Sequence, residues 1–185
     1  SATTKQQIAA AEYYPPAARF TDNIMQIVSS GPFGKWRTLL QADSYAIARA
    51  RRRVWIQTPY YLPSDVLNSA LQEAALAGID VRLMLPARSD SKVVDLATHS
   101  YLHSKLLIID DMLSVIGSAN MDFRSFEHNF EVNAFVYDGE FTARMASVFE
   151  EDQSRSHPLT PAEWFRRPRS RRVAESLMRV FSPLL

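Results

Sequence analysis

At 185 residues the chain is long enough for one domain with a hydrophobic core, and a composition of 46% hydrophobic and 11% aromatic residues excludes a disordered protein. The net charge of +1 excludes an overall attraction to nucleic acid or to an anionic membrane, so any such attraction must come from local clusters. The chain contains no cysteine, which excludes disulfides and thiolate metal sites. Its apolar stretches are shorter than a membrane span, so we expect a soluble or peripheral chain.

The first half of the chain alternates strand and helix patterns after a polar, alanine-rich segment at residues 1–20, which we interpret as a tail or linker. Ser64 is a favourable N-cap and Gly78 a favourable C-terminal residue for one of the helices. A strand–helix–strand order favours a parallel pair of strands and an α/β fold. The predicted elements are a strand at 24–28, a helix at 36–51, a strand at 54–58, a helix at 65–77 and a strand at 80–85.

A helical pattern at 91–101 runs directly into the next strand, with no turn residues at Leu102–His103. A parallel connection normally needs a complete helix and its loops. Either this helix is unusually short, or residues are omitted between Leu102 and His103. We favour the omission.

The second half begins with two strands around a tight reversal at Asp111-Met112, which predicts a hairpin. From Pro161 onwards the sequence is helical and rich in arginine. We therefore interpret residues 21–160 as the main domain and residues 161–185 as a basic amphipathic helix. The predicted elements are strands at 105–110, 114–116 and 130–137 and a helix at 140–152.

The chemically informative segment runs from His103 to Asn120. Alternation along a strand places His103 and Lys105 on the same face. The run Gly117-Ser118-Ala119-Asn120 closes the neighbouring strand and can bring Asn120 beside them. Gly117 allows a close approach between the backbone and an anionic ligand. We expect these residues to form a phosphate-binding site.

These residue types suit phosphodiester transfer. An imidazole nitrogen of His103 can attack phosphorus and give a covalent phosphohistidine. Donors from Lys105, Asn120 and Ser118 would stabilise the negative charge that develops on the non-bridging oxygens. A carboxylate bonded to the other ring nitrogen would fix the tautomer of the histidine, and Glu131 is the candidate. The leaving alkoxide needs a proton, ideally from a second imidazole on the opposite side.

The spacing argues against coincidence. Six fixed residues at these separations are expected by chance about once in a few hundred thousand chains of this length. The alternative, in which His103 and Lys105 are ordinary strand residues and Asn120 is a turn residue, is therefore disfavoured. The other histidines show no ligand spacing with acidic partners, and we expect them to be non-catalytic: His99, His128 and His157.

His103-x-Lys105, Asp110 and Gly117-Ser118-x-Asn120 resemble the HKD motif of the phospholipase D superfamily. The resemblance implies an α-β-α sandwich with a mixed, mainly parallel sheet, of which this chain is one HKD half-domain. It implies a two-step reaction without metal or other cofactor, at a site built from two such motifs. The acid paired with the histidine would be Glu131. Asp110 would be a scaffold residue, with Gly117 and Ser118 in supporting roles.

Gln57–Pro63, Gly117–Asp138 and Ser182–Leu185 resemble the C-terminal half of bacterial cardiolipin synthases, and the resemblance covers residues 24–185. It implies a phosphatidyltransferase that joins two phosphatidylglycerol molecules and releases glycerol. His103 is then the nucleophile or, alternatively, the general acid. The resemblance also implies a place at the cytoplasmic face of the bacterial cell membrane, in a parent chain with a membrane anchor. In this family a helix and a strand precede the motif histidine, which supports an omission before His103.

The chain carries a single His-x-Lys motif, so we expect the second HKD half to come from the rest of a longer parent chain, which we favour, or from a homodimer partner. Two alternatives stay open. A homodimeric phosphodiesterase or nuclease would use water as the acceptor, although the mild charge and the lack of a basic–aromatic stripe argue against nucleic acid as a partner. An inert half would bind anionic lipid through terminal arginines at positions 166, 167, 169, 171, 172 and 179.

Overall fold

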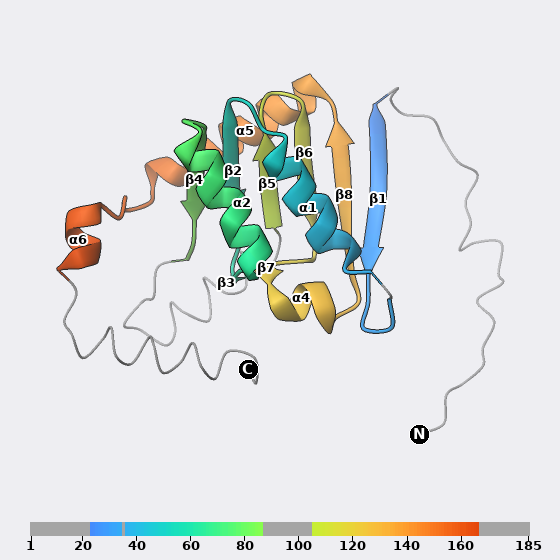
Figure 1. Ribbon diagram of the computed structural model, residues 1–185. Coiled ribbons are helices and arrows are strands. Elements are labelled where there is room, and N and C mark those ends of the chain that lie inside the picture. Colours follow the sequence, from blue (N-terminus) through green and yellow to red (C-terminus); the bar gives the residue numbers. More distant parts are fainter. Residues whose placement is uncertain (1–22, 35, 87–104, 167–185) are drawn as a thin grey trace, which may run out of the picture.

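The structure, a computed structural model, describes residues 23–34, 36–86 and 105–166 (Figure 1). The tail at 1–20, the helix predicted at 91–101, the Leu102–His103 junction and most of residues 161–185 lie outside these ranges. The strands are β1 (Ile24–Ser30), β2 (Arg53–Gln57), β3 (Tyr61–Leu62), β4 (Asp80–Met84), β5 (Lys105–Ile109), β6 (Leu113–Gly117), β7 (Met121–Asp122) and β8 (Glu131–Tyr137). The helices are α1 (Thr38–Ala48), α2 (Asp65–Leu76), α4 (Phe123–Glu127), α5 (Gly139–Ser154) and α6 (Pro161–Phe165).

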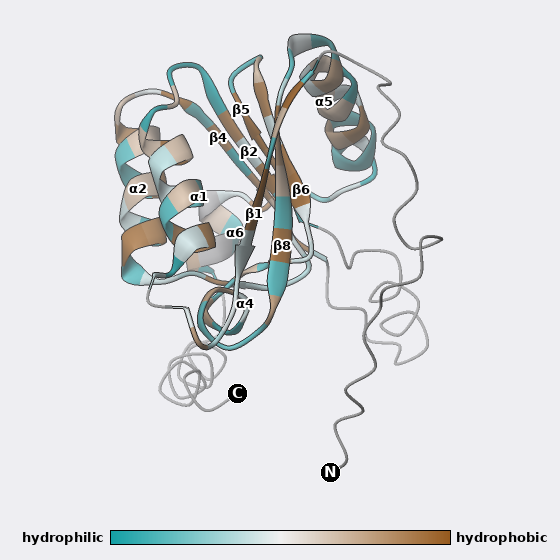
Figure 2. Ribbon diagram, turned by 90° about the vertical axis from the view of Figure 1, so that its right-hand side faces the viewer, coloured by the Kyte–Doolittle hydropathy of each residue, from teal (hydrophilic) through white to brown (hydrophobic). Residues whose placement is uncertain are grey.

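A six-stranded mixed sheet with the order β1-β8-β6-β5-β2-β4 forms the centre of the fold. Helices α1 and α2 cover one face, and α5 covers the other (Figure 2). Strands β3 and β7 form a separate parallel pair. The α/β class, the mixed sheet and the α-β-α layering are therefore confirmed.

The expectation of a mainly parallel sheet is wrong. Among the described strands of this sheet, only β2 and β4 run parallel, joined through α2 as predicted. The pairs β2–β5, β5–β6, β6–β8 and β1–β8 are antiparallel. The physical reason is clearest between β5 and β6, where the reversal at Asp110-Asp111-Met112 is far too short for the crossover that parallel strands need.

The capping residues predicted at the two ends of α2 are confirmed. The Ser64 hydroxyl accepts a hydrogen bond from the Leu67 N–H (3.4 Å) at the start of α2. Gly78 follows that helix with φ of +83°, a conformation that glycine adopts without strain. The structure adds α4, which the sequence patterns did not predict. Its N-cap is Asp122, whose carboxylate accepts from the Ser125 N–H (2.9 Å).

Apolar layers hold the sheet from both sides. The larger layer lies between the sheet and helices α1 and α2, and includes Leu39, Ile47 and Leu107. In the smaller layer, under α5, the Trp55 ring stacks on Phe149 with centroids 5.2 Å apart. Both layers reach β5, through Leu107 in the larger layer and Ile108 in the smaller one.

Candidate functional site

Lys105, Gly117 and Asn133 form a row across the sheet. Lys105 begins β5 and pairs with Gly117, the last residue of β6, which in turn pairs with Asn133 of β8. Directly paired residues project from the same face, which here is the face that α1 covers. The row lies at the end of the sheet near α4 (Figure 1). The fold therefore brings together two of the predicted site residues, Lys105 and Gly117.

The ammonium group of Lys105 is buried and forms an ion pair with Asp43 of α1; both side chains are 0% exposed. The Lys105 Nζ lies 5.9 Å from the centroid of the Phe126 ring. Burial raises the pKa of the Asp43 carboxyl because desolvation disfavours its charged form, and Lys105 opposes that rise. The sequence patterns did not identify Asp43. Its position four residues from both Leu39 and Ile47, on the apolar face of a predicted helix, was the available signal.

The row leaves no room for a side chain at Gly117. A Cβ atom there would contact the amide oxygen of Asn133 and the carbonyl of Val132, and would lie 2.6 Å from the Asn133 Cα. The same Asn133 oxygen accepts a hydrogen bond from the Ala119 N–H (3.2 Å). The close approach at Gly117 is thus an approach to strand β8. Its predicted role toward an anionic ligand stays a prediction.

Ser118 and Asn120 follow directly after β6. The Ser118 hydroxyl accepts a hydrogen bond from the Val132 N–H (3.1 Å), which ties this segment to β8. The amide oxygen of Asn120 is buried, and no described residue forms a hydrogen bond with it. Buried polar atoms are normally paired, so this amide has capacity for a further partner. A contact with phosphate stays a prediction for both residues.

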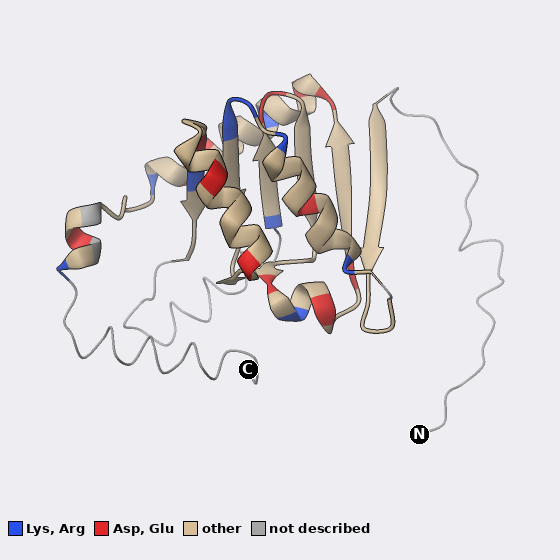
Figure 3. Ribbon diagram, viewed as in Figure 1, with Lys and Arg blue, Asp and Glu red and all other residues tan. Residues whose placement is uncertain are grey.

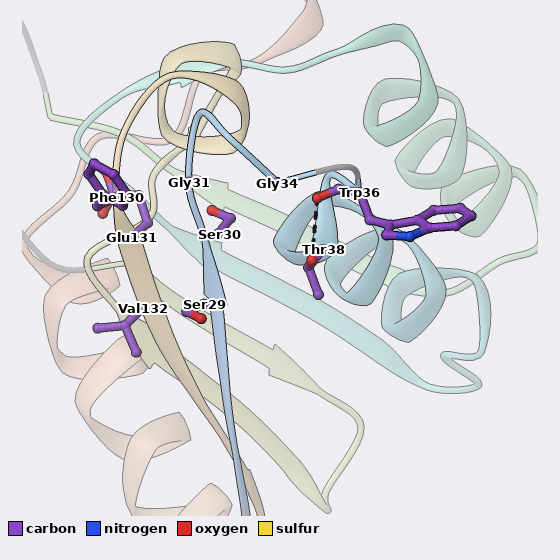
Figure 4. Close-up of a pocket in the computed structure, with 9 residues that line it drawn as sticks. All are labelled: Ser29, Ser30, Gly31, Gly34, Trp36, Thr38, Phe130, Glu131 and Val132. Carbon is purple, nitrogen blue, oxygen red and sulfur yellow. Dashed lines mark hydrogen bonds between the residues drawn. The ribbon is translucent and has the colours of Figure 1, made fainter.

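Glu131 lines an open pocket of about 490 Å³ where β1 ends and β8 begins (Figure 4). Its carboxylate accepts a hydrogen bond from the Asn129 side-chain amide (3.1 Å). His103 lies outside the described residues, so its pairing with Glu131 stays a prediction. The other polar and aromatic residues of the pocket are Ser29, Ser30, Trp36, Thr38 and Phe130.

Asp110 lies at the opposite end of β5 from Lys105, roughly 17 Å of extended strand away. Its carboxylate accepts hydrogen bonds of 2.7–3.1 Å from three successive backbone N–H groups, those of residues 51–53. The arginines of that segment form the blue stretch that leads into β2 in Figure 3. Asp110 also adopts φ of +52° at the reversal between β5 and β6. The motif aspartate thus ties this hairpin to β2.

Asp110→Ala is expected to lower the free energy of unfolding by about 2–3 kcal/mol, because three backbone donors lose a charged acceptor. Asp111→Ala is the matched control. It removes exposed ion pairs with Arg52 and Arg53, which contribute about 0–1 kcal/mol. Urea denaturation measures both. If Asp110→Gly, which suits the positive φ, cost no more than Asp111→Ala, the hydrogen bonds would not be the source of the loss.

Two other histidines have partners of their own. The ring of His128 meets Phe123 edge-on, with centroids 5.1 Å apart. The His157 Nε2 lies 3.3 Å from a carboxylate oxygen of Glu163. His99 lies outside the described ranges. Within residues 23–34, 36–86 and 105–166, no group of three or more His, Cys, Asp or Glu side chains is placed to hold a metal ion.

Comparisons of the sequence with known proteins agree with one another. Residues 90–153 match the family described as cardiolipin synthase, PLD-like domain. The chain is 40% identical over 202 positions to cardiolipin synthase 2 of Bacillus cereus. This alignment covers 98% of this chain and 39% of that protein. It is 39% identical over 179 positions to the major cardiolipin synthase ClsA of Bacillus subtilis. That alignment covers 87% of this chain and 37% of that protein. The chain thus spans less than half the length of these relatives.

The alignment with the Bacillus cereus protein is longer than the chain itself, at 202 positions against 185 residues. That relative therefore contains residues that have no counterpart in this chain. If residues are omitted between Leu102 and His103, the relative must contain residues that this chain lacks, as it does.

Solved structures show the same fold. Nuc from Salmonella typhimurium, a phospholipase D family member, matches with a TM-score of 0.55 and 18% identity, over 70% of this chain and 93% of that one. NucT from Helicobacter pylori matches with a TM-score of 0.54 and 21% identity, over 69% of this chain and 95% of that one. Phosphatidylserine synthase of Haemophilus influenzae matches with a TM-score of 0.52 and 15% identity, over 72% of this chain and 38% of that one.

Proposed function

Since this chain belongs to the phospholipase D superfamily, we propose that it is one catalytic half of a cardiolipin synthase, a phosphatidyltransferase that joins two phosphatidylglycerol molecules. The observation that carries the proposal is the pairing of Lys105 with Gly117, which brings the lysine and the glycine of the HKD motif to one end of the sheet. It occurs in a chain that is 40% identical to a cardiolipin synthase.

The proposed reaction has two steps. An imidazole nitrogen of His103 attacks the phosphorus of one phosphatidylglycerol, and the bond to the headgroup glycerol oxygen breaks. The departing oxygen takes a proton from the histidine of a second HKD half. That histidine then takes a proton from the hydroxyl of another phosphatidylglycerol, whose oxygen displaces His103 from phosphorus. The products are cardiolipin and glycerol, and the enzyme returns to its starting state.

The other motif residues have separate roles in this proposal. Lys105, Asn120 and Ser118 donate to the non-bridging oxygens, where negative charge develops. Glu131 accepts from the second ring nitrogen of His103 and so fixes its tautomer.

The proposal needs a second HKD half, from the rest of a parent chain or from a second copy of this one. The comparison supports the parent chain, because the relatives are more than twice as long as the aligned part. By its similarity to cardiolipin synthases, we place the site at the cytoplasmic face of the bacterial membrane. In the part of the chain that the structure describes, no helix has both the length and the apolar character needed to cross a membrane.

A homodimeric phosphodiesterase is the second candidate. It is favoured by the solved structures, because the match covers 95% of the NucT chain and 93% of the Nuc chain. The same matched part covers only 69–70% of this chain, so chains shorter than this one exist with this fold. In this candidate two copies supply the two motifs, and water takes the place of the lipid acceptor.

Vesicles of phosphatidylglycerol labelled in the headgroup glycerol separate these functions. We expect the assembled enzyme, which is this chain together with the second HKD half, to release one glycerol for each cardiolipin formed. Glycerol and phosphatidic acid without cardiolipin would identify water as the acceptor. Binding to the vesicles with no glycerol released in any assembly would identify an inert lipid-binding half. Activity that appears only at dimer-forming concentrations of this chain would indicate a homodimer.

A further inference from the structure

The motif lysine is paired with a carboxylate from a different layer of the fold. Asp43 lies on α1 four residues after Leu39 and four before Ile47, both of which are fully buried. This spacing puts the three residues on the helix face that packs against the sheet. The ion pair therefore joins the middle of α1 to Lys105, the first residue of β5.

Stability alone does not account for this pair. Desolvation of two charges offsets much of their attraction, and apolar side chains of similar volume often serve a core equally well. Asp43 is also incompletely compensated, because its second oxygen, Oδ1, is buried and no described residue forms a hydrogen bond with it. A carboxylate at this position calls for a reason beyond packing.

A buried lysine needs an anion beside it in order to stay charged, since desolvation favours the neutral amine. A neutral amine stabilises the charge on transferring phosphoryl oxygens far less than an ammonium does. An ammonium group also has three N–H donors. Among the described residues, the hydrogen bond that Lys105 donates to Asp43 uses one of these donors.

We infer that Asp43 is a positioning residue for the phosphodiester, because its carboxylate holds the side chain of Lys105 and fixes the direction of its remaining donors. The inference rests on the proposed function, in which Lys105 binds the phosphate of the substrate. Asp43 acts only through Lys105. A purely structural pair would change stability on substitution but would leave the phosphate response of the lysine as it was.

The state of Lys105 can be followed directly, because the chain has four lysines, at positions 5, 35, 92 and 105. With lysine labelled at the ¹³Cε atom, the signal that is lost in Lys105→Met identifies this residue. In the wild-type chain we expect a signal that moves on titration with inorganic phosphate. In Asp43→Asn we expect the position of this signal to change, because its carboxylate partner is lost, and its response to phosphate to weaken by about tenfold or more.

Thr142→Val is the matched control. Thr142 is also fully buried and polar, and its hydroxyl bonds to Ser114 (3.1 Å) on the α5 face of the sheet. Both substitutions remove a buried polar interaction, but only Asp43→Asn reaches Lys105. In the assembled enzyme we expect Asp43→Asn to lower kcat/KM per folded molecule by about tenfold to a hundredfold, less than the loss of a donor outright. Thr142→Val should leave kcat/KM unchanged.

A Lys105 signal and phosphate response that do not change in Asp43→Asn would overturn the inference, and so would an unchanged kcat/KM per folded molecule. If the wild-type enzyme forms no cardiolipin, the proposed function fails, and the phosphate response of Lys105 alone decides the role of Asp43. If Asp43→Asn does not fold, Asp43→Glu keeps the charge but moves it by one methylene. We then expect a weaker phosphate response of the Lys105 signal, and an unchanged response contradicts the inference.

Discussion

Replacement of His103 with alanine is expected to lower phosphatidyl transfer by about a thousandfold or more, because the covalent step loses its nucleophile. The phosphatidyl adduct on the enzyme should disappear at the same time. Mass spectrometry of enzyme quenched during turnover on phosphatidylglycerol measures the adduct as a mass shift. Cardiolipin formation measures the transfer.

His157→Ala is the control for this experiment, because His157 is an exposed ring paired with Glu163 and should not affect either measurement. An adduct that persists in His103→Ala while transfer is lost would make His103 the general acid. The nucleophile would then belong to the second HKD half. If both adduct and transfer persist, the assignment of the site to this motif is wrong.

Gly117→Ala is expected to lower the free energy of unfolding by about 3 kcal/mol, at the upper end of the cost of overpacking. The new methyl group would meet the carbonyl of Val132 and the Cα of Asn133, which belong to the backbone of the paired strand. Backbone atoms cannot rotate away, so β6 and β8 would have to separate. Urea denaturation measures the loss.

Gly31→Ala is the control, because its added methyl group would meet a side chain and not the backbone. A Cβ atom at Gly31 would lie 2.8 Å from a ring carbon of Phe130, and that ring is 77% exposed. The ring can turn into solvent, so we expect a change within about 0.5 kcal/mol. Equal losses for the two variants would contradict the explanation by backbone contact. A small loss in Gly117→Ala would show that the sheet adapts easily at this row.

Much of the local structure could be predicted because its causes are local. The cap at Ser64, the positive φ at Gly78 and the alternating apolar residues of β5 each depend on a few neighbouring residues. The same holds for the HKD motif, whose two parts lie on consecutive strands. The hairpin between β5 and β6 then brings Lys105 and Gly117 into register.

The relative direction of the paired strands, parallel or antiparallel, could not be predicted in the same way. The antiparallel pairing of β1 with β8 joins residues more than a hundred positions apart, and no local pattern encodes it. The strand–helix–strand pattern before β5 was correct for β2 and β4. The error lay in extending it to the later strands, of which β5 and β6 are joined by a short reversal.

Two other features were missed for different reasons. Helix α4 has five residues, which is too short for a periodic pattern. Asp43 was missed because an acidic residue in a helix is usually exposed. Its side chain instead lies on the apolar face of α1, where its partner Lys105 comes from a strand far along the chain.

The position of Asp110, a strand length away from Lys105, bears on how natural variation at the motif would be tolerated. Changes at His103 would leave a cell with a normal amount of enzyme that does not turn over. Changes at Asp110 would instead reduce the amount of enzyme, because less stable chains are degraded, while each surviving molecule kept its rate. A screen that scores abundance and turnover separately would therefore separate the histidine of the motif from its aspartate, and added chaperone or lower growth temperature would rescue only the variants at the aspartate.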